Sequence, residues 1–221
     1  MSTDVLILRR RDVADLLSLD DCISAVREAF RRHATDAPAP AVLGLHVEGG
    51  GFHVKAAALA LDRFYFAAKV NGNFPGNAAR GGLPTIQGVV VLADAERGSP
   101  LAIMDSIEIT IQRTAAATAV AAEVLARRNA ATAAIVGCGL QGRVQLRALT
   151  RVRAIGRAFA IDSDVTAAQR FAKEMSESLG IPIDASHDIP AALAESDICV
   201  TCTPSKRAII MQPDVRPGTF V

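Results

Sequence analysis

Hydrophobic positions in the first half of the chain change from a helical to a strand-like spacing. In RDVADLLSLDDCISAVREAFRRHA, residues 11–34, apolar side chains recur every three or four positions, which predicts two helices, with Ser18 or Asp20 capping the second. Glycines 49–51 and the segment AERGS should close two hairpins, so this half is expected to be an α+β unit on an antiparallel sheet. The predicted strands lie near residues 42–48, 52–59, 63–70, 85–94 and 100–106.

The second half begins with a long alanine-rich helix and then alternates strands with helices. The helix is expected within residues 105–130, where Asp105 and Glu108 have capping-box spacing. The alternation that follows is typical of a Rossmann-type, doubly wound parallel α/β sheet, so we place two domains at residues 1–115 and 116–221. Strands are predicted near 134–136, 159–161, 181–183 and 198–201, and helices from 142, over 165–179 and near 189–194.

Composition and charge exclude several classes of partner. The 221-residue chain is 50% hydrophobic and has a formal net charge of +1 without a basic run, so neither nucleic acid nor a membrane surface is an expected partner. Charges within the first 17 residues argue against an export signal, and we expect a cytoplasmic protein. Reduced, packed thiols are expected at Cys22, Cys138, Cys199 and Cys202.

The segment AAIVGCGLQGRVQLRAL, residues 133–149, contains the spacing G-x-G-x-x-G in Gly137, Gly139 and Gly142. An apolar strand precedes it and a helical pattern follows, as the phosphate-binding turn of a dinucleotide fold requires. The glycines would allow a tight turn and the approach of a pyrophosphate to the helix N-terminus. Asp162 ends the next strand and would bind the ribose hydroxyls, which favours NAD over NADP. The alternative is a structural βαβ unit that binds no nucleotide.

Two lysines in the first half are candidates for substrate chemistry. Lys69 lies in the apolar run RFYFAAKV and Lys55 in FHVKAAAL, and a lysine among apolar groups suits chemistry on amino or imino acids. For both, the alternative is a solvated strand lysine. Arg113 and Thr114 on the long helix are further candidates, with solvated positions as the alternative. No metal site is predicted, because no metal-ligand spacing joins the histidines, which are expected to be structural or at the surface: His33, His46, His53 and His187.

Several of these segments together resemble the ornithine cyclodeaminase/mu-crystallin family over nearly the whole chain. The resemblance rests on FAAKVNGNFPGN, GLPTIQG, QRTAAATAVAA, AIVGCGLQGRVQLRAL and TCTPS. It implies a substrate domain that forms a homodimer, an NAD-binding Rossmann domain, and hydride transfer between small amino acids and imines.

The resemblance also implies roles for individual residues. Lys69 is similar to the family's active-site lysine near the substrate carboxylate, and Arg113 to an arginine that contacts both substrate and cofactor. Many relatives carry an arginine for the substrate carboxylate just before the strand that is predicted here at residues 42–48. That arginine is missing from this chain, and we expect Lys55 to take its role. Cofactor contacts are implied or expected at Thr85, Arg113, Thr114, Gly137, Gly139, Leu140, Gln141, Gly142, Asp162 and Thr203.

The function expected from the resemblance is that of an ornithine cyclodeaminase, an NAD-dependent enzyme that converts L-ornithine to L-proline and ammonia. An alanine dehydrogenase or a cyclic ketimine (pyrroline-2-carboxylate) reductase is the alternative, and a non-catalytic dinucleotide-binding protein is a second. Relatives in this family continue with a further strand, an aspartate for the substrate amine, and C-terminal helices. We therefore expect the Rossmann sheet of residues 116–221 to be incomplete.

Overall fold

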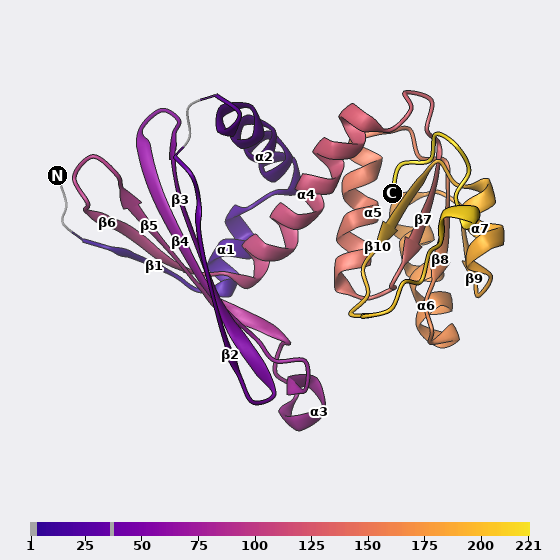
Figure 1. Ribbon diagram of the computed structural model, residues 1–221, viewed down its shortest axis with the longest axis horizontal. Coiled ribbons are helices and arrows are strands. Elements are labelled where there is room, and N and C mark those ends of the chain that lie inside the picture. The colour runs from indigo at the N-terminus through magenta and orange to yellow at the C-terminus, as the bar shows by residue number, and fades with distance from the viewer. Residues whose placement is uncertain (1–3, 36–37) are drawn as a thin grey trace. The chain divides into compact units, whose positions relative to one another are not determined.

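The computed structural model describes residues 4–35 and 38–221 (Figure 1). Contacts within the chain separate two compact units, Met1–Gln112 and Arg113–Val221. The division falls inside the long helix α4 (Ile107–Leu125). At its start, Asp105 accepts a hydrogen bond from the amide of Ile107, whereas Glu108 pairs with Arg10. The predicted capping box is therefore wrong, because Glu108 is engaged by helix α1 (Arg10–Leu16).

A six-stranded sheet forms the first unit, and its strand order is β1-β6-β5-β4-β3-β2. The predicted hairpins are confirmed: β2 pairs antiparallel with β3, and β5 with β6. Strand β1 was not predicted, because three residues are too short to show a period; it pairs parallel with β6. The strands are β1 (Leu6–Leu8), β2 (Ala41–Val47), β3 (Gly50–Ala60), β4 (Phe64–Asn73), β5 (Ile86–Asp94) and β6 (Pro100–Asp105).

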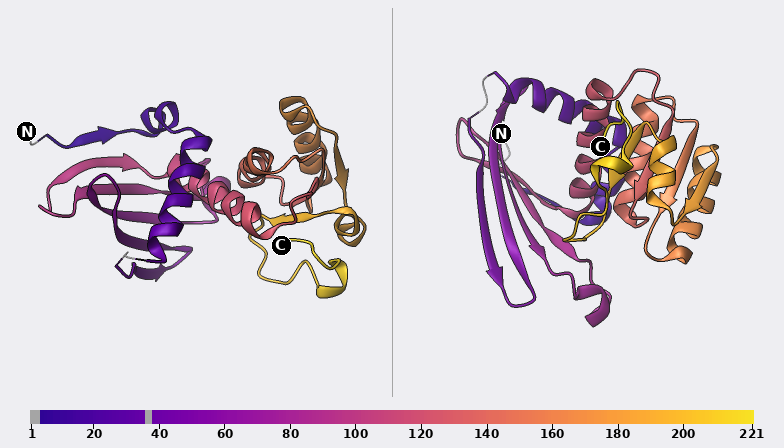
Figure 2. Two further views of the ribbon diagram at one scale, coloured as in Figure 1. Left: turned by 90° about the horizontal axis from the view of Figure 1, so that it is seen from above. Right: turned by 45° about the vertical axis from the view of Figure 1, so that its right-hand side comes forward.

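Helices α1 and α2 (Leu19–His33) lie on one side of this sheet, as Figure 2 shows. Ser18 caps α2 by accepting a hydrogen bond from the amide of Asp21, which confirms one of the two predicted caps. A short helix, α3 (Asn77–Gly81), follows β4 where the sequence predicted a turn.

The two faces of the sheet differ in burial. The helix-side face includes Asn71 and Val90, which are 6% and 9% exposed. The opposite face, which we call the open face, includes Val70 at 38% and Val89 at 42% exposed. Successive side chains on a strand point to opposite faces, so Val70 and Asn71 lie on opposite faces of the sheet, as do Val89 and Val90. The helices therefore cover one face of the sheet at β4 and β5 and leave the opposite face open, whereas every residue of β2 is exposed.

The second unit is a parallel four-stranded sheet with the order β10-β7-β8-β9. Its core lies on both faces: one cluster includes Ile135, Phe171 and Ile198, and another includes Phe159 and Leu193. The doubly wound Rossmann-type fold is thereby confirmed. Its elements are β7 (Thr132–Val136), α5 (Leu140–Val152), β8 (Arg157–Ile161), α6 (Val165–Leu179), β9 (Ile183–Ser186), α7 (Ile189–Glu195), β10 (Ile198–Thr201) and a 3-10 turn, η1 (Gln212–Asp214).

Several predicted boundaries in this unit are wrong, and β7 and β8 each begin two residues earlier than predicted, at Thr132 and Arg157. Strand β9 begins at Ile183 rather than 181, because Gly180 ends α6 in the left-handed conformation and Pro182 cannot donate to a strand ladder. Helix α5 begins at Leu140 rather than 142, with Gly139 at its N-cap. Among the described residues, no helix combines the length and apolarity that crossing a bilayer needs.

Candidate functional site

The glycine loop joins β7 to α5 and leaves free space beside one of its three glycines. Gly137 has a φ of 106°, and a Cβ there would lie 2.5 Å from the carbonyl oxygen of Cys202. At Gly142, a Cβ would lie 2.2 Å from the carbonyl oxygen of Gly137. At Gly139, in contrast, a Cβ would meet no described atom within 4 Å. Two glycines are thus required by the fold, and the third leaves free space beside the first turn of α5.

The first turn of α5 is available to an anion. Gly139 occupies the N-cap and supplies no side-chain oxygen to the amides of the first turn. In the same turn, the Gln141 side chain buries its Nε2 without a hydrogen-bond partner among the described residues. Unpaired donors at a helix N-terminus, together with the helix dipole, favour a phosphate. These donors and the space beside Gly139 fit the pyrophosphate of a dinucleotide.

Asp162 lies at the carboxyl end of β8 and is held by backbone amides. One carboxylate oxygen accepts from the amide of Cys138 at 2.8 Å, and the other from the amide of Asp164 at 3.0 Å. Burial by itself would raise the pKa of Asp162, but these hydrogen bonds lower that pKa below its usual value. The carboxylate is therefore ionised and fixed beside the glycine loop, where it can accept from ribose hydroxyls and repel a 2′-phosphate.

A cavity of about 640 Å³ opens at the carboxyl ends of the four strands. This volume lies in the range of small-molecule sites. The structure brings four of the predicted residues to it, namely Gly137, Gly139, Asp162 and Thr203. Sequence reasoning missed other lining residues, which include His187, Ile189, Ser205 and Ile209. Ile189 begins α7 and the other three lie in loops, and only the strand order brings them together. Among the predicted residues outside the lining, Leu140 is 56% exposed in the first turn of α5.

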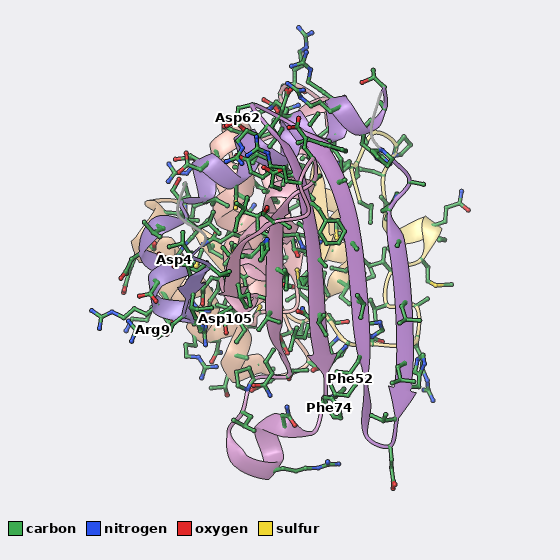
Figure 3. All side chains as sticks on the ribbon, turned by 90° about the vertical axis from the view of Figure 1, so that its left-hand side faces the viewer. Asp4, Arg9, Phe52, Asp62, Phe74 and Asp105 are labelled. Atoms are coloured by element: carbon green, nitrogen blue, oxygen red, sulfur yellow. The ribbon has the colours of Figure 1, made fainter. Side chains whose placement is uncertain are left out.

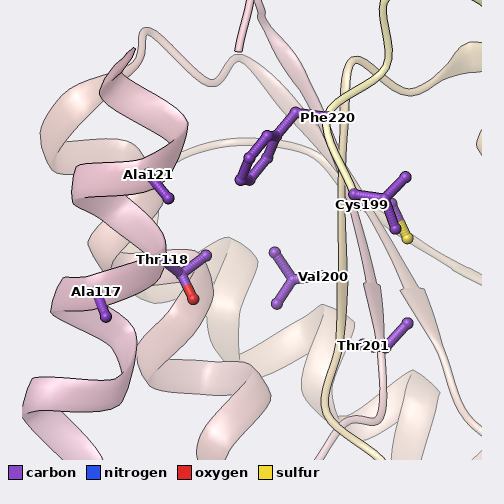
Figure 4. A pocket seen from close by; sticks show the side chains of 8 residues that line it. Ala117, Thr118, Ala121, Cys199, Val200, Thr201 and Phe220 are labelled. Atoms are coloured by element: carbon purple, nitrogen blue, oxygen red, sulfur yellow. The ribbon is translucent and has the colours of Figure 1, made fainter. Parts of the chain in front are cut away.

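A second cavity, of about 360 Å³, lies between α4 and the edge strand β10 (Figure 4). Ala117, Ala121, Val200 and Phe220 contribute to its largely apolar lining. Phe220 pairs in parallel fashion with β10, since its carbonyl oxygen accepts from the amide of Cys199. None of the lining residues carries a charged side chain, so we assign this cavity no chemistry.

The cysteines are packing residues. All four are free. Burial raises the pKa of Cys199 to about 12 and that of Cys202 to about 11, so both thiols stay protonated at neutral pH. The C-x-x-C spacing therefore does not mark a reactive pair.

In the first unit, Lys69 belongs to a hydrogen-bonded cluster. Its Nζ donates to Thr110 Oγ1 at 3.3 Å, and Asn71 Nδ2 reaches the same oxygen at 3.5 Å. Asn71 is buried, and its Oδ1 accepts from the buried Ser106 hydroxyl at 2.7 Å. Strand register then places Lys55 directly opposite Lys69, on the same face. Lys69 is half-buried and Lys55 is exposed. The alternative of a solvated strand lysine therefore fits Lys55 better than Lys69.

The remaining predicted residues lie on α4 and beside β5. Arg113 is exposed and Thr114 half-buried, and both lie on α4. Thr85 is exposed just before β5, where its carbonyl oxygen accepts from the amide of Phe74. Their predicted contacts with substrate or cofactor stay predictions.

Comparison with known proteins gives consistent matches over nearly the whole chain. A sequence model of the ornithine cyclodeaminase/mu-crystallin family matches residues 3–221. The alanine dehydrogenase of Archaeoglobus fulgidus is 36% identical over 99% of this chain and 66% of its own length.

Two solved structures are similar to this chain. An archaeal alanine dehydrogenase dimer with bound NAD has a TM-score of 0.91 and 36% identity, covering 97% of this chain and 65% of its own. The Delta(1)-pyrroline-2-carboxylate reductase of Thermococcus litoralis, in complex with NADH and L-proline, has a TM-score of 0.88 and 33% identity, covering 97% and 67%. The chain thus spans about two thirds of the length of these relatives.

Proposed function

Because this chain belongs to the ornithine cyclodeaminase/mu-crystallin family, we propose that it is an NAD-dependent enzyme that interconverts a small amino acid and its imine. The observation that carries the proposal is the pairing of an open glycine loop with the amide-held carboxylate of Asp162. Both similar structures contain NAD or NADH, which supports the same cofactor here.

Different residues near the larger cavity would bind different parts of the cofactor. The amides of the first turn of α5 and the Gln141 side chain would hold the pyrophosphate, and Asp162 the adenosine ribose. Thr203 lines the same cavity and would contact the cofactor from the β10 side. When bound, NAD supplies a nicotinamide ring that accepts hydride from the amino acid's Cα.

Lys69 and the residues hydrogen-bonded around it, Thr110, Asn71 and Ser106, would hold the substrate. The lysine's ammonium group would bind the α-carboxylate, while Thr110 and Asn71 fix the direction of the lysine side chain. Asn71 is in turn held by Ser106, so the anchor rests on a buried hydrogen bond rather than on a mobile side chain. Arg113, Thr114 and Thr85 complete the proposed contacts with substrate and cofactor.

A substitution tests the anchor separately from the cofactor site. Lys69→Met keeps the apolar stem and removes the charge, and we expect kcat/KM to fall at least 100-fold, or about 3 kcal/mol of transition-state stabilisation. The affinity for NAD should change less than threefold. Equal kcat/KM in the variant and the wild type would contradict the assignment.

Among specific activities, we propose first an ornithine cyclodeaminase that forms L-proline and ammonia from L-ornithine. An alanine dehydrogenase or a pyrroline-2-carboxylate reductase is the alternative, and the names of the similar proteins favour it. Product analysis after incubation with NAD separates them. Proline with ammonia and no net NADH indicates a cyclodeaminase, whereas net NADH with L-alanine or L-proline indicates the alternative.

A non-catalytic dinucleotide-binding protein is the remaining candidate. It predicts stoichiometric NAD binding without product formation or a change in absorbance at 340 nm for any amino or imino acid tested. The four free cysteines support a reducing, cytoplasmic location for any of these functions.

We propose that the protein forms a homodimer through the open face of the first unit. Large apolar side chains on this face are exposed, including Leu43 at 64%, Leu45 at 60% and Phe52 at 41%. Figure 3 shows Phe52 beside Phe74, and their ring centroids are 5.5 Å apart. An exposed apolar sheet face is typical of a protein–protein interface. The similar alanine dehydrogenase structure is also a dimer.

A further inference from the structure

Two glutamines on α5 bury side-chain atoms that have no hydrogen-bond partner. Gln145 is 3% exposed, and its Oε1 accepts no hydrogen bond in the part of the chain that the structure describes. Gln141 lies four residues closer to the glycine loop, and its buried Nε2 has no acceptor among the described residues. The first atom is an acceptor and the second a donor, so the two unpaired groups are complementary.

The helix places these two side chains beside each other. Residues four apart on an α-helix share one face, with Cβ atoms about 5–6 Å apart, which is within reach of two glutamine side chains. Both residues lie in the regular part of α5, Leu140–Val152. A change of side-chain rotamer is therefore enough to let Gln141 Nε2 donate to Gln145 Oε1.

Packing alone does not explain the presence of Gln145. Its neighbours Val144 and Leu146 are buried, and so is Leu149, one turn further along α5. A polar group buried without a hydrogen bond is unfavourable, whereas an apolar side chain of the same shape is not. Residues that break this rule in a packed core are expected at functional sites.

The chemistry of the Gln141 amide indicates what Gln145 does. A pyrophosphate accepts hydrogen bonds and donates none, so the Gln141 amide must present its Nε2 rather than its Oε1 to the phosphate oxygens. Nε2 carries two hydrogens, of which one can donate to Gln145 Oε1 and the other to a phosphate oxygen. An acceptor behind the amide thus selects the orientation that binds an anion.

We propose that Gln145 is a positioning residue, whose Oε1 holds the Gln141 side-chain amide so that this amide donates to the pyrophosphate of NAD. This inference rests on the proposed function, since it takes the first turn of α5 as the pyrophosphate site. Gln145 acts through Gln141 and does not itself touch the cofactor. In the NAD-bound state, both unpaired groups gain a partner.

Gln145→Met tests the proposal in the full chain, because methionine keeps the length of the side chain and removes the acceptor. Calorimetry should show an NAD affinity at least fivefold lower than that of the wild type. The same loss is expected for ADP-ribose, which keeps the pyrophosphate and lacks the nicotinamide. Without nucleotide, the midpoint of denaturant unfolding should not fall, because Gln145 Oε1 has no recorded hydrogen bond to lose.

Gln169→Met is the matched control for that substitution. It makes the same chemical change at an exposed position on the neighbouring helix α6. Neither the NAD affinity nor the unfolding midpoint should change in this variant. A fivefold loss of NAD affinity in Gln169→Met would mean that the loss in Gln145→Met is not specific, and would overturn the proposal.

A double substitution separates positioning from a role in packing. If Gln145 acts through Gln141, then adding Gln145→Met to a Gln141→Met chain should lower NAD affinity less than twofold further. An equal loss of affinity in the two backgrounds would show that Gln145 does not act through Gln141, and would overturn the proposal.

The binding results also distinguish this inference from the proposed function. If Gln145→Met binds NAD with wild-type affinity, the inference is wrong and the cofactor assignment stands. If the wild-type chain binds no NAD, the cofactor assignment is wrong, and the inference is overturned with it.

Discussion

The two sheets of this protein are built from equally apolar strands, yet they are buried to different extents. In the parallel sheet, Ile135, Ala160 and Ile198 are fully buried, because helices cover both faces. In the antiparallel sheet, Leu43 is 64% and Val89 is 42% exposed, because helices cover one face alone. Layering rather than strand composition therefore decides which apolar residues are buried.

The same difference separates the chemistry of the two units. The second unit shows a formed glycine loop, a fixed carboxylate and a cavity, all from one packed sheet. The first unit carries its polar groups on the covered face and apolar groups on the open one. The packed unit is suited to hold a cofactor by itself, whereas we propose that the first unit binds substrate on one face and a second copy on the other.

The largest expected effect comes from disturbing the packed unit at Gly142. In Gly142→Ala, the new Cβ would lie 2.2 Å from the Gly137 carbonyl oxygen, so the turn must shift. We expect the free energy of unfolding to fall by about 2–3 kcal/mol and NAD affinity to fall more than tenfold. Denaturant unfolding and calorimetry measure the two effects.

Gly139→Ala is the matched control for that substitution. A Cβ here meets no described atom within 4 Å, so stability should change by less than about 0.5 kcal/mol. The methyl group would still occupy the space assigned to the pyrophosphate, and NAD affinity should fall. A Gly139→Ala variant with full NAD affinity would mean that the phosphates bind elsewhere.

A charged substitution on the open face tests the proposed dimer interface of the first unit. Leu45→Glu places a carboxylate in the proposed dimer interface, and we expect a shift from dimer to monomer in light scattering, with an increase in the dimer dissociation constant of at least tenfold. The control is Val165→Glu, at a 56% exposed position at the start of α6. Identical masses for Leu45→Glu and wild type would refute an interface at this face.

A smaller effect is expected inside the covered face. Asn71→Ala leaves the buried Ser106 hydroxyl without its acceptor. Loss of such a hydrogen bond costs about 1–2 kcal/mol of unfolding free energy. The KM for the amino acid should also rise, since Asn71 helps to position Thr110 beside Lys69. Stability loss without a change in KM would assign Asn71 a structural role alone.

The smallest effect concerns pH. Because the pKa of Asp162 is lowered, its contribution to NAD binding should be lost only as the pH falls below the usual aspartate value near 3.9. NAD affinity should therefore differ less than twofold between pH 7 and pH 5. A tenfold loss over that interval would show that the carboxylate is not held as described.

Much of the fold was predictable because local signals are strong. Helix α6 has the predicted bounds, with Asp164 at its N-cap and Gly180 at its end. The G-x-G-x-x-G spacing identified two residues of the cavity lining, Gly137 and Gly139. Strand β1 escaped prediction because its three residues are too short to show a period.

The less predictable features depend on register and on sheet order. The direct opposition of Lys55 and Lys69 follows from the register of β3 and β4, which strand periodicity alone does not give. His187 and Ile209 reach the cavity only because parallel strands end at one edge of the sheet. The open face could not be recognised either, since strand periodicity does not show which of the two faces the helices cover.

Calorimetric titration of the full chain with NAD and with NADP tests whether the glycine loop and Asp162 form a cofactor site. One NAD should bind per chain, at least tenfold more tightly than NADP, because Asp162 accepts from the ribose and repels a 2′-phosphate. Binding of neither nucleotide, or equal affinity for both, would contradict this assignment.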